Sequence, residues 1–100
     1  MATLNLDIPH SLPQDEALAR IKNLLASMKE EQKDTISDVH ENWQENKGSF
    51  GFKAKGFDLS GDITVNASNI QIRSQLPLAL SFFKGAIGDV ITKKANELLK

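Results

Sequence analysis

The chain has 100 residues, of which 40% are hydrophobic and 25% are charged, an ordinary globular composition that excludes a long disordered tract. Its formal net charge is −1, with 12 basic and 13 acidic residues, so it lacks the basic surface typical of nucleic-acid-binding domains. Cysteine is absent, which excludes disulfides, thiolate metal ligands and cysteine nucleophiles.

The length predicts a single domain over residues 1–100, because one hydrophobic core commonly serves a chain of this size. The first eight residues have neither a basic segment nor a continuous apolar stretch, so no signal peptide is expected. The longest apolar run, Leu76–Phe83, is shorter than the roughly 20 residues that span a bilayer. We therefore expect a soluble, cytoplasmic protein.

Alternating apolar residues predict a strand over about residues 3–8, which Pro9 ends. Ser11, followed three residues later by Gln14, predicts a capping box at the start of a helix. Apolar residues at steps of three and four then predict one continuous helix to about Lys33. Its buried stripe is expected to contain Leu18, Ile21, Leu24, Leu25 and Met28.

Four strands are predicted after this helix. The first, over about residues 35–46, is polar, and Asn46-Lys47-Gly48 predicts the tight turn of a hairpin. The second ends at Gly56, and two more run to about Gln75 with strict alternation, which indicates an antiparallel sheet with one wet face. The inward-facing residues are expected to be Phe50, Phe52, Ala54, Phe57, Leu59, Gly61, Ile63, Val65, Ile70 and Ile72.

Pro77 predicts the start of a long final helix, because its missing N–H is harmless in a first turn. The core-facing stripe of that helix is expected to contain Leu80, Phe83, Ile87, Val90, Ile91 and Leu98. The resulting order β-α-β-β-β-β-α predicts a two-layer α+β fold, in which a curved antiparallel sheet packs against two helices. A long helix lying across such a sheet is the arrangement called helix-grip.

Candidate catalytic groups are isolated in the sequence. His10 and His40 have no second ligand at metal-binding spacing, so a surface or capping role is expected for both. Asp58 and Asp62 lie about 13 Å apart along one strand, beyond the roughly 5–9.5 Å of paired catalytic carboxylates. There is no nucleophile motif and no phosphate-binding loop. We therefore predict a non-enzymatic protein with no catalytic residue, no cofactor and no metal site.

One motif resembles an RNA-binding loop. The segment Gly85–Ile91 fits the G-x-x-G-x-x-I spacing of a KH loop, which clamps a nucleotide backbone. The two residues between the glycines, Ala86 and Ile87, supply no positive charge for phosphate. We favour the interpretation that Gly85 and Gly88 let the helix backbone approach the sheet, and KH-like RNA binding is the weaker alternative.

A second apolar row on the final helix contains Leu78, Phe82 and Ala86. A helix that is apolar on more than one face is either enclosed or available for contact. Either Leu78 and Phe82 pack against the first helix, or they meet a dimer mate, a hydrophobic ligand or an apolar interface. These three residues are the candidate contact surface.

Three groups of residues carry a resemblance to a known family. Pro9-His10-Ser11-Leu12 precedes an alanine-rich helix, and Trp43 precedes a turn that leads to Phe50 and Phe52. The third group comprises Gly61-Asp62-Ile63-Thr64-Val65, Ile70-Gln71-Ile72, Leu76-Pro77, Phe83-Lys84-Gly85-Ala86-Ile87 and Leu98-Leu99. Over nearly the whole chain these residues resemble the small polyhydroxyalkanoic acid system proteins, whose genes lie beside those for polyester granule synthesis and use.

The resemblance implies a cytoplasmic bacterial protein that acts at or near storage granules, with no established reaction. We therefore hypothesise non-enzymatic binding to the granule surface or to a granule protein through Leu78, Phe82 and Ala86. A small domain that binds a hydrophobic ligand and a homodimeric structural module stay open as alternatives. The cavity of the ligand-binding alternative is expected to be lined by Phe50, Phe52, Leu59 and Ile63.

Overall fold

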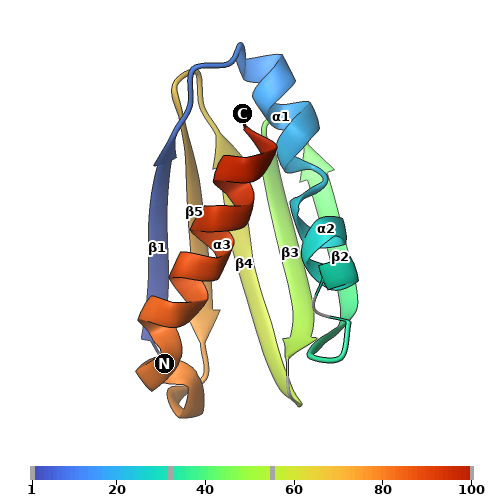
Figure 1. Ribbon diagram of the computed structural model, residues 1–100, viewed down its shortest axis with the longest axis vertical. Coiled ribbons are helices and arrows are strands. Elements are labelled where there is room, and N and C mark those ends of the chain that lie inside the picture. The colour runs from blue at the N-terminus through green and yellow to red at the C-terminus, as the bar shows by residue number, and fades with distance from the viewer. Residues whose placement is uncertain (1, 32, 55, 100) are drawn as a thin grey trace.

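The computed structural model describes residues 2–31, 33–54 and 56–99 (Figure 1). The elements follow in the order β1-α1-α2-β2-β3-β4-β5-η1-α3, where η1 is a 3-10 helix. The strands are β1 (Ala2–Pro9), β2 (Ile36–Gln44), β3 (Lys47–Ala54), β4 (Phe57–Val65) and β5 (Asn69–Leu76). The helices are α1 (Gln14–Ile21), α2 (Leu24–Glu31), η1 (Leu78–Phe83) and α3 (Lys84–Leu98).

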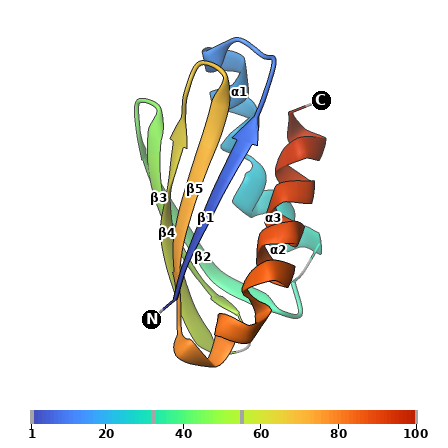
Figure 2. The ribbon, with the colours of Figure 1, turned by 90° about the vertical axis from the view of Figure 1, so that its left-hand side faces the viewer.

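The strands form one antiparallel sheet in the order β1-β5-β4-β3-β2. Strands β2 to β5 each lie beside their neighbour in the sequence, whereas β1 pairs with the distant β5, with Ala2 opposite Leu76 and Pro9 opposite Asn69. Figure 2 shows the helices packed on one face of this sheet. The predicted two-layer α+β fold is confirmed, and its finer description as helix-grip stays a prediction.

The hydrophobic core lies between the helices and the inward face of the sheet. Successive strand residues point to opposite faces, so alternate residues of β4 and β5 enter the core. Ile63, Ile70 and Ile72 are at most 1% exposed, as the alternation predicts. Phe57 is the exception, since it lies at the start of β4 and is 37% exposed.

The first helical segment differs from the predicted single helix. It divides into α1 and α2 at Lys22 and Asn23, where the Asn23 N–H donates to Arg20 O in a tighter turn (3.1 Å) and its side chain bonds the Ala19 carbonyl. The predicted capping box is also wrong, because α1 begins after Pro13 without a side-chain cap. The local hydrogen bonds that Asn23 donates therefore interrupt the helix. The predicted stripe is nevertheless buried at Ile21, Leu24, Leu25 and Met28.

The hairpin between β2 and β3 turns one residue earlier than predicted. Gln44 pairs with Lys47, so the loop is Glu45-Asn46, and Glu45 adopts a positive φ of 56°. Gly48 lies in β3, where an added Cβ would come within 2.7 Å of the Trp43 ring. The glycine is thus required by the packing of Trp43 rather than by the turn.

The C-terminal segment contains two helix types where one was predicted. After Pro77, the Leu80 N–H donates to Pro77 O (2.9 Å), which is the i→i−3 bond of a 3-10 helix. At Phe83, φ of −101° and ψ of 9° separate η1 from α3. Because a 3-10 helix has three residues per turn, Leu78 and Phe82 do not continue into one row with Ala86.

The buried face of α3 is narrow and contains two small residues. Gly88, Ile91 and Ala95 are buried at steps of three and four. The predicted stripe is wrong for Phe83 and Val90, which are 56% and 50% exposed, because a helix this close to the sheet leaves flanking side chains at its rim. The remaining members of the predicted stripe, Leu80, Ile87 and Leu98, are half-buried against the core.

The two glycines of α3 have different surroundings. A Cβ on Gly88 would lie 3.3 Å from Leu4 Cδ1 and 3.3 Å from Leu6 Cδ2, whereas a Cβ on Gly85 would meet no heavy atom within 4 Å. The predicted close approach to the sheet is therefore confirmed at Gly88 and wrong at Gly85. Because α3 is continuous from Lys84 to Leu98, the KH-loop alternative is wrong as well.

Substitution of the two glycines tests this packing. We expect Gly88→Leu to lower the free energy of unfolding by about 1–3 kcal/mol, because the new side chain must displace Leu4 and Leu6. Gly85→Leu is the matched control, and its stability is expected not to fall, since leucine favours the helical backbone over glycine. Urea denaturation followed by circular dichroism measures both changes, and equal losses would contradict the close approach.

An ion-pair cluster ties α2 to α3. Lys94 Nζ lies 2.6 Å from Glu31 Oε1 and 3.2 Å from Glu97 Oε2. The hydrogen bond to Glu31 raises the pKa of Lys94 above its ordinary value of 10.5. Because the fold favours the charged amine, the cluster stabilises the protein fully below the unfolded-state pKa, and this stabilisation is lost as the pH rises through the raised pKa.

The charge dependence of this cluster can be measured by thermal unfolding. We expect Lys94→Met to lower Tm at pH 7, and the difference from the native protein to shrink above the raised pKa of Lys94. Lys93→Met, one residue away at an exposed position, is expected to leave Tm nearly unchanged. A Tm difference for Lys94→Met that persists unchanged at high pH would contradict stabilisation by the charge of Lys94.

Candidate functional site

An apolar groove of about 340 Å³ lies between α3 and the end of the sheet where β3 leads into β4. Thr35 is the single polar residue among the described residues that line it. The apolar lining residues are Met28, Ile36, Phe52, Ala54, Leu59, Leu80, Phe83, Ala86, Ile87, Val90 and Ile91. The volume is at the lower end of the roughly 300–1,000 Å³ range of ligand pockets.

The groove follows from the way the helices diverge over the sheet. Figure 1 shows α2 beside β2, whereas the N-terminal end of α3 lies over β1 and β5. The helices are joined at the other end, where Lys94 bonds Glu31 and the Arg20 guanidinium donates to Leu98 O (3.4 Å). A groove therefore remains between α3 and the inward faces of β3 and β4 toward η1, where Phe52 and Leu59 form part of its wall.

Exposed apolar side chains continue outward from the groove. We call Leu78, Phe82, Phe83, Ala86 and Val90 the apolar rim. Leu78 is 70% exposed and Phe82 is 92% exposed, so the alternative in which they pack against the first helix is wrong. Phe83, Ala86 and Val90 line the groove itself. Large exposed apolar side chains gathered on one segment of the chain typically mark a contact surface.

The cavity predicted for a hydrophobic ligand is only partly correct. Phe52 and Leu59 line the groove, but Phe50 and Ile63 do not. Phe50 stacks on Phe52 with ring centroids 6.1 Å apart and Ile63 is 1% exposed, so both belong to the packed core. Phe83 and Val90 were predicted to face the core, and both line the groove together with the other stripe residues Leu80, Ile87 and Ile91.

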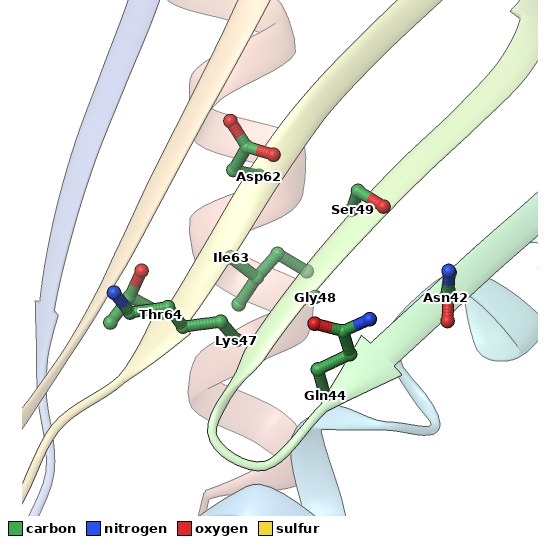
Figure 3. A pocket seen from close by; sticks show the side chains of 8 residues that line it. All are labelled: Asn42, Gln44, Lys47, Gly48, Ser49, Asp62, Ile63 and Thr64. Atoms are coloured by element: carbon green, nitrogen blue, oxygen red, sulfur yellow. The ribbon is translucent and has the colours of Figure 1, made fainter.

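The helix-free face of the sheet carries two polar depressions, of about 400 and 350 Å³. Figure 3 shows polar side chains of β2, β3 and β4 standing above the sheet in the first of them. Asp62 and Thr64 line both depressions. Covering hydrated amides, hydroxyls and carboxylates lowers the free energy little, whereas moving an apolar lining out of water lowers it substantially. The groove is therefore the stronger candidate site.

Titratable residues do not converge on either site. Within the described ranges, no three His, Cys, Asp or Glu side chains are grouped so as to hold a metal ion. The His10 ring lies 3.0 Å from Asn66 O through Nε2 and accepts the Leu12 N–H at Nδ1 (3.2 Å), so it bonds loop backbone ahead of α1 and does not cap the helix. His40 is exposed on β2 and packs over Gly51, as expected for a surface residue.

Comparison with known proteins gives one family. A family model described as "Putative polyhydroxyalkanoic acid system protein" matches residues 4–99, nearly the whole chain. No curated protein and no solved structure matches the sequence significantly. Among the described helices, none combines the length and the apolarity that crossing a membrane requires. The chain belongs to the polyhydroxyalkanoic acid system protein family.

Proposed function

We propose that the protein binds the surface of polyhydroxyalkanoate granules through its apolar rim and catalyses no reaction there. The observation that carries this proposal is the exposure of Phe82 (92%) and Leu78 (70%) on η1, next to an apolar groove. Family membership supplies the class of partner, since the family is named for the polyhydroxyalkanoic acid system. In this proposal the protein acts in the bacterial cytoplasm, where it meets the polymer.

The chemistry of η1 suits contact with an apolar polyester. Covering a leucine or phenylalanine side chain contributes about 1.5–3 kcal/mol each. Ser81, the single hydroxyl residue of η1, donates its Oγ–H to Leu78 O (2.8 Å), so its hydrogen bond is already made inside the segment. Lys84 follows at once and is exposed, and its ammonium can donate to the ester carbonyls of the polymer.

The test is co-sedimentation with protein-free polyhydroxyalkanoate granules. We expect Leu78→Ser combined with Phe82→Ser to weaken granule binding by about two orders of magnitude, because roughly 3 kcal/mol of apolar contact is lost. Both side chains are largely exposed, so the free energy of unfolding is expected to stay within about 0.5 kcal/mol of the native value.

A matched control places the same substituents on the opposite face of the molecule. Gln71→Ser combined with Asp58→Ser changes two exposed residues of the helix-free face and is expected to leave sedimentation unchanged. If the Leu78 and Phe82 double variant co-sediments with granules as well as the native protein does, the apolar rim is not the binding surface. Equal loss in both double variants would indicate non-specific adsorption.

A second candidate function, binding of a small hydrophobic ligand, is favoured by the groove of about 340 Å³ with its apolar lining. This candidate differs from granule binding because the ligand enters between α3 and the sheet, where Phe52 and Leu59 form part of the wall. Leu78 and Phe82 lie outside that lining. The two functions can therefore be separated by substitution.

Filling the groove distinguishes the two candidates. Ala86→Phe adds a ring at the groove wall, and we expect it to weaken binding of 3-hydroxydecanoate at least about tenfold if the ligand occupies the groove. Isothermal titration calorimetry measures this affinity, and the Leu78 and Phe82 variant is expected to retain it. Absence of 3-hydroxydecanoate binding by the native protein would count against the ligand-binding candidate and leave granule binding untouched.

A further inference from the structure

The outer edge of β1 is uncovered. β1 is the last strand of the sheet on its side, and Figure 2 looks onto this edge with no helix passing in front of it. An uncovered edge strand presents unpaired N–H and C=O groups that can pair with another chain. The hydrogen-bond pattern of β1 shows which groups these are.

The outward groups of β1 belong to its odd-numbered residues. The His10 N–H donates to Ser68 O (3.0 Å), and this pair continues the register in which Pro9 lies opposite Asn69. In an antiparallel ladder, hydrogen-bonded and non-hydrogen-bonded residues alternate, so the N–H and C=O groups of residues 3, 5 and 7 point away from β5. Pro9 takes the next outward position, where its missing N–H costs no ladder bond.

The side chains beside this edge are directed to β5. Arg73 Nε donates to Asn5 Oδ1 (3.3 Å), and Asn69 Nδ2 donates to Asp7 Oδ1 (2.7 Å). Strand β1 contains no lysine or arginine, and its pairing with β5 runs without a register shift from end to end. The devices that usually protect an edge strand, namely lysines, bulges and an internal proline, are therefore missing from residues 2–8.

The opposite edge of the sheet is protected. The register of β2 shifts between Ser37 and His40, and Asp38 within that shift has a positive φ of 53°. A bulge of this kind bends and twists the strand, which prevents a second chain from pairing along its length. Pairing of β1 with β2 of another copy, which would propagate into a fibre, is disfavoured.

We propose that β1 pairs with β1 of a second copy of this chain, antiparallel about a twofold axis at Asn5. In this register Asn5 lies opposite Asn5 of the partner subunit, and Thr3 lies opposite Asp7 of the partner subunit, so every outward N–H and C=O group of these residues is paired. On the core side, Leu4 lies beside Leu6 of the partner subunit, and half-buried Leu6 gains cover. A register shifted by one step places Pro9 opposite Thr3 of the partner subunit. Because proline has no N–H, the carbonyl of Thr3 of the partner subunit would then be unpaired.

The twofold axis is perpendicular to the sheet and joins two five-stranded sheets into one. Both helical layers then lie on the same face of the joined sheet. Figure 1 shows α3 crossing diagonally from β1 near η1 toward α1, so much of its length lies away from the shared edge. Because the same strand is used by both copies, the assembly closes as a dimer.

A single cysteine tests the register, because the native chain has none. Directly opposed hydrogen-bonded residues have Cα atoms about 5.5 Å apart, within the 4.4–6.8 Å range of disulfides. We expect Asn5→Cys to form a disulfide-linked dimer under mild oxidation, and Asn42→Cys, an exposed asparagine on β2, to remain monomeric on a non-reducing gel. Equal cross-linking of the two variants, or none at Asn5→Cys, would overturn the proposed pairing.

Sedimentation equilibrium supplies the independent test without a cross-link. The native protein is expected at twice its chain mass of 11.0 kDa. Asn5→Pro removes an outward N–H that β5 does not use, so we expect this variant to sediment as a folded monomer with native circular dichroism. A native protein that sediments as a monomer at its highest soluble concentration would refute the dimer, whatever the fate of Asn5→Pro.

Discussion

The contact of Gly88 with Leu4 and Leu6 sets the position of α3 on the sheet, and the rest of the candidate site depends on that position. A bulkier residue at Gly88 would lift the helix from β1. With the backbone held close, only a narrow stripe of α3 is buried, and the larger side chains beside it remain at the surface. Close packing at one glycine therefore produces both the rigid helix and the apolar rim.

The groove arises because the two halves of α3 contact different elements. Its C-terminal half is bound to α2 through Lys94 and Glu31, and its N-terminal half is held over β1 by Gly88. Between these contacts the helices diverge, and the groove opens over β3 and β4, where Phe52 and Leu59 line it and are only 7% and 4% exposed. The exposed apolar surface is that of the rim, and its contact with water costs free energy, which is the physical reason to assign it a partner.

The sheet could be predicted from the sequence because alternation is a local property. Ile63, Ile70 and Ile72 are buried as their spacing indicates, and the order of the elements is correct. Two of the failures involve contacts between residues that lie apart in the sequence. The Gln14 side chain bonds the Val65 carbonyl (2.8 Å) instead of forming a capping box, and Gly48 is needed for a ring on the neighbouring strand.

The candidate site was predicted in part for the same reason. Leu78, Phe82 and Ala86 are exposed, as expected of a contact surface, but the row they were assigned to assumed an α-helix throughout. The 3-10 turn after Pro77 changes the phase, so Phe83 joins the surface instead of the core. Helix type at a junction depends on how the chain leaves β5, which no short window of sequence records.

The pairing of β1 with β5 has a consequence for how the chain acquires its fold during synthesis. Paired residues of the two strands are separated by 60 to 74 positions in the sequence. Of the five strands, β1 therefore leaves the ribosome first and β5 leaves it last. At about 5–20 residues per second, the delay is roughly 3–15 s. Throughout that interval Leu4, Leu6 and Ile8 have no neighbouring strand to join, and α3, which packs Gly88 against Leu4 and Leu6, has not yet been synthesised. The strand that begins the sequence therefore completes the sheet, and the nascent protein is most vulnerable to misassembly before β5 emerges.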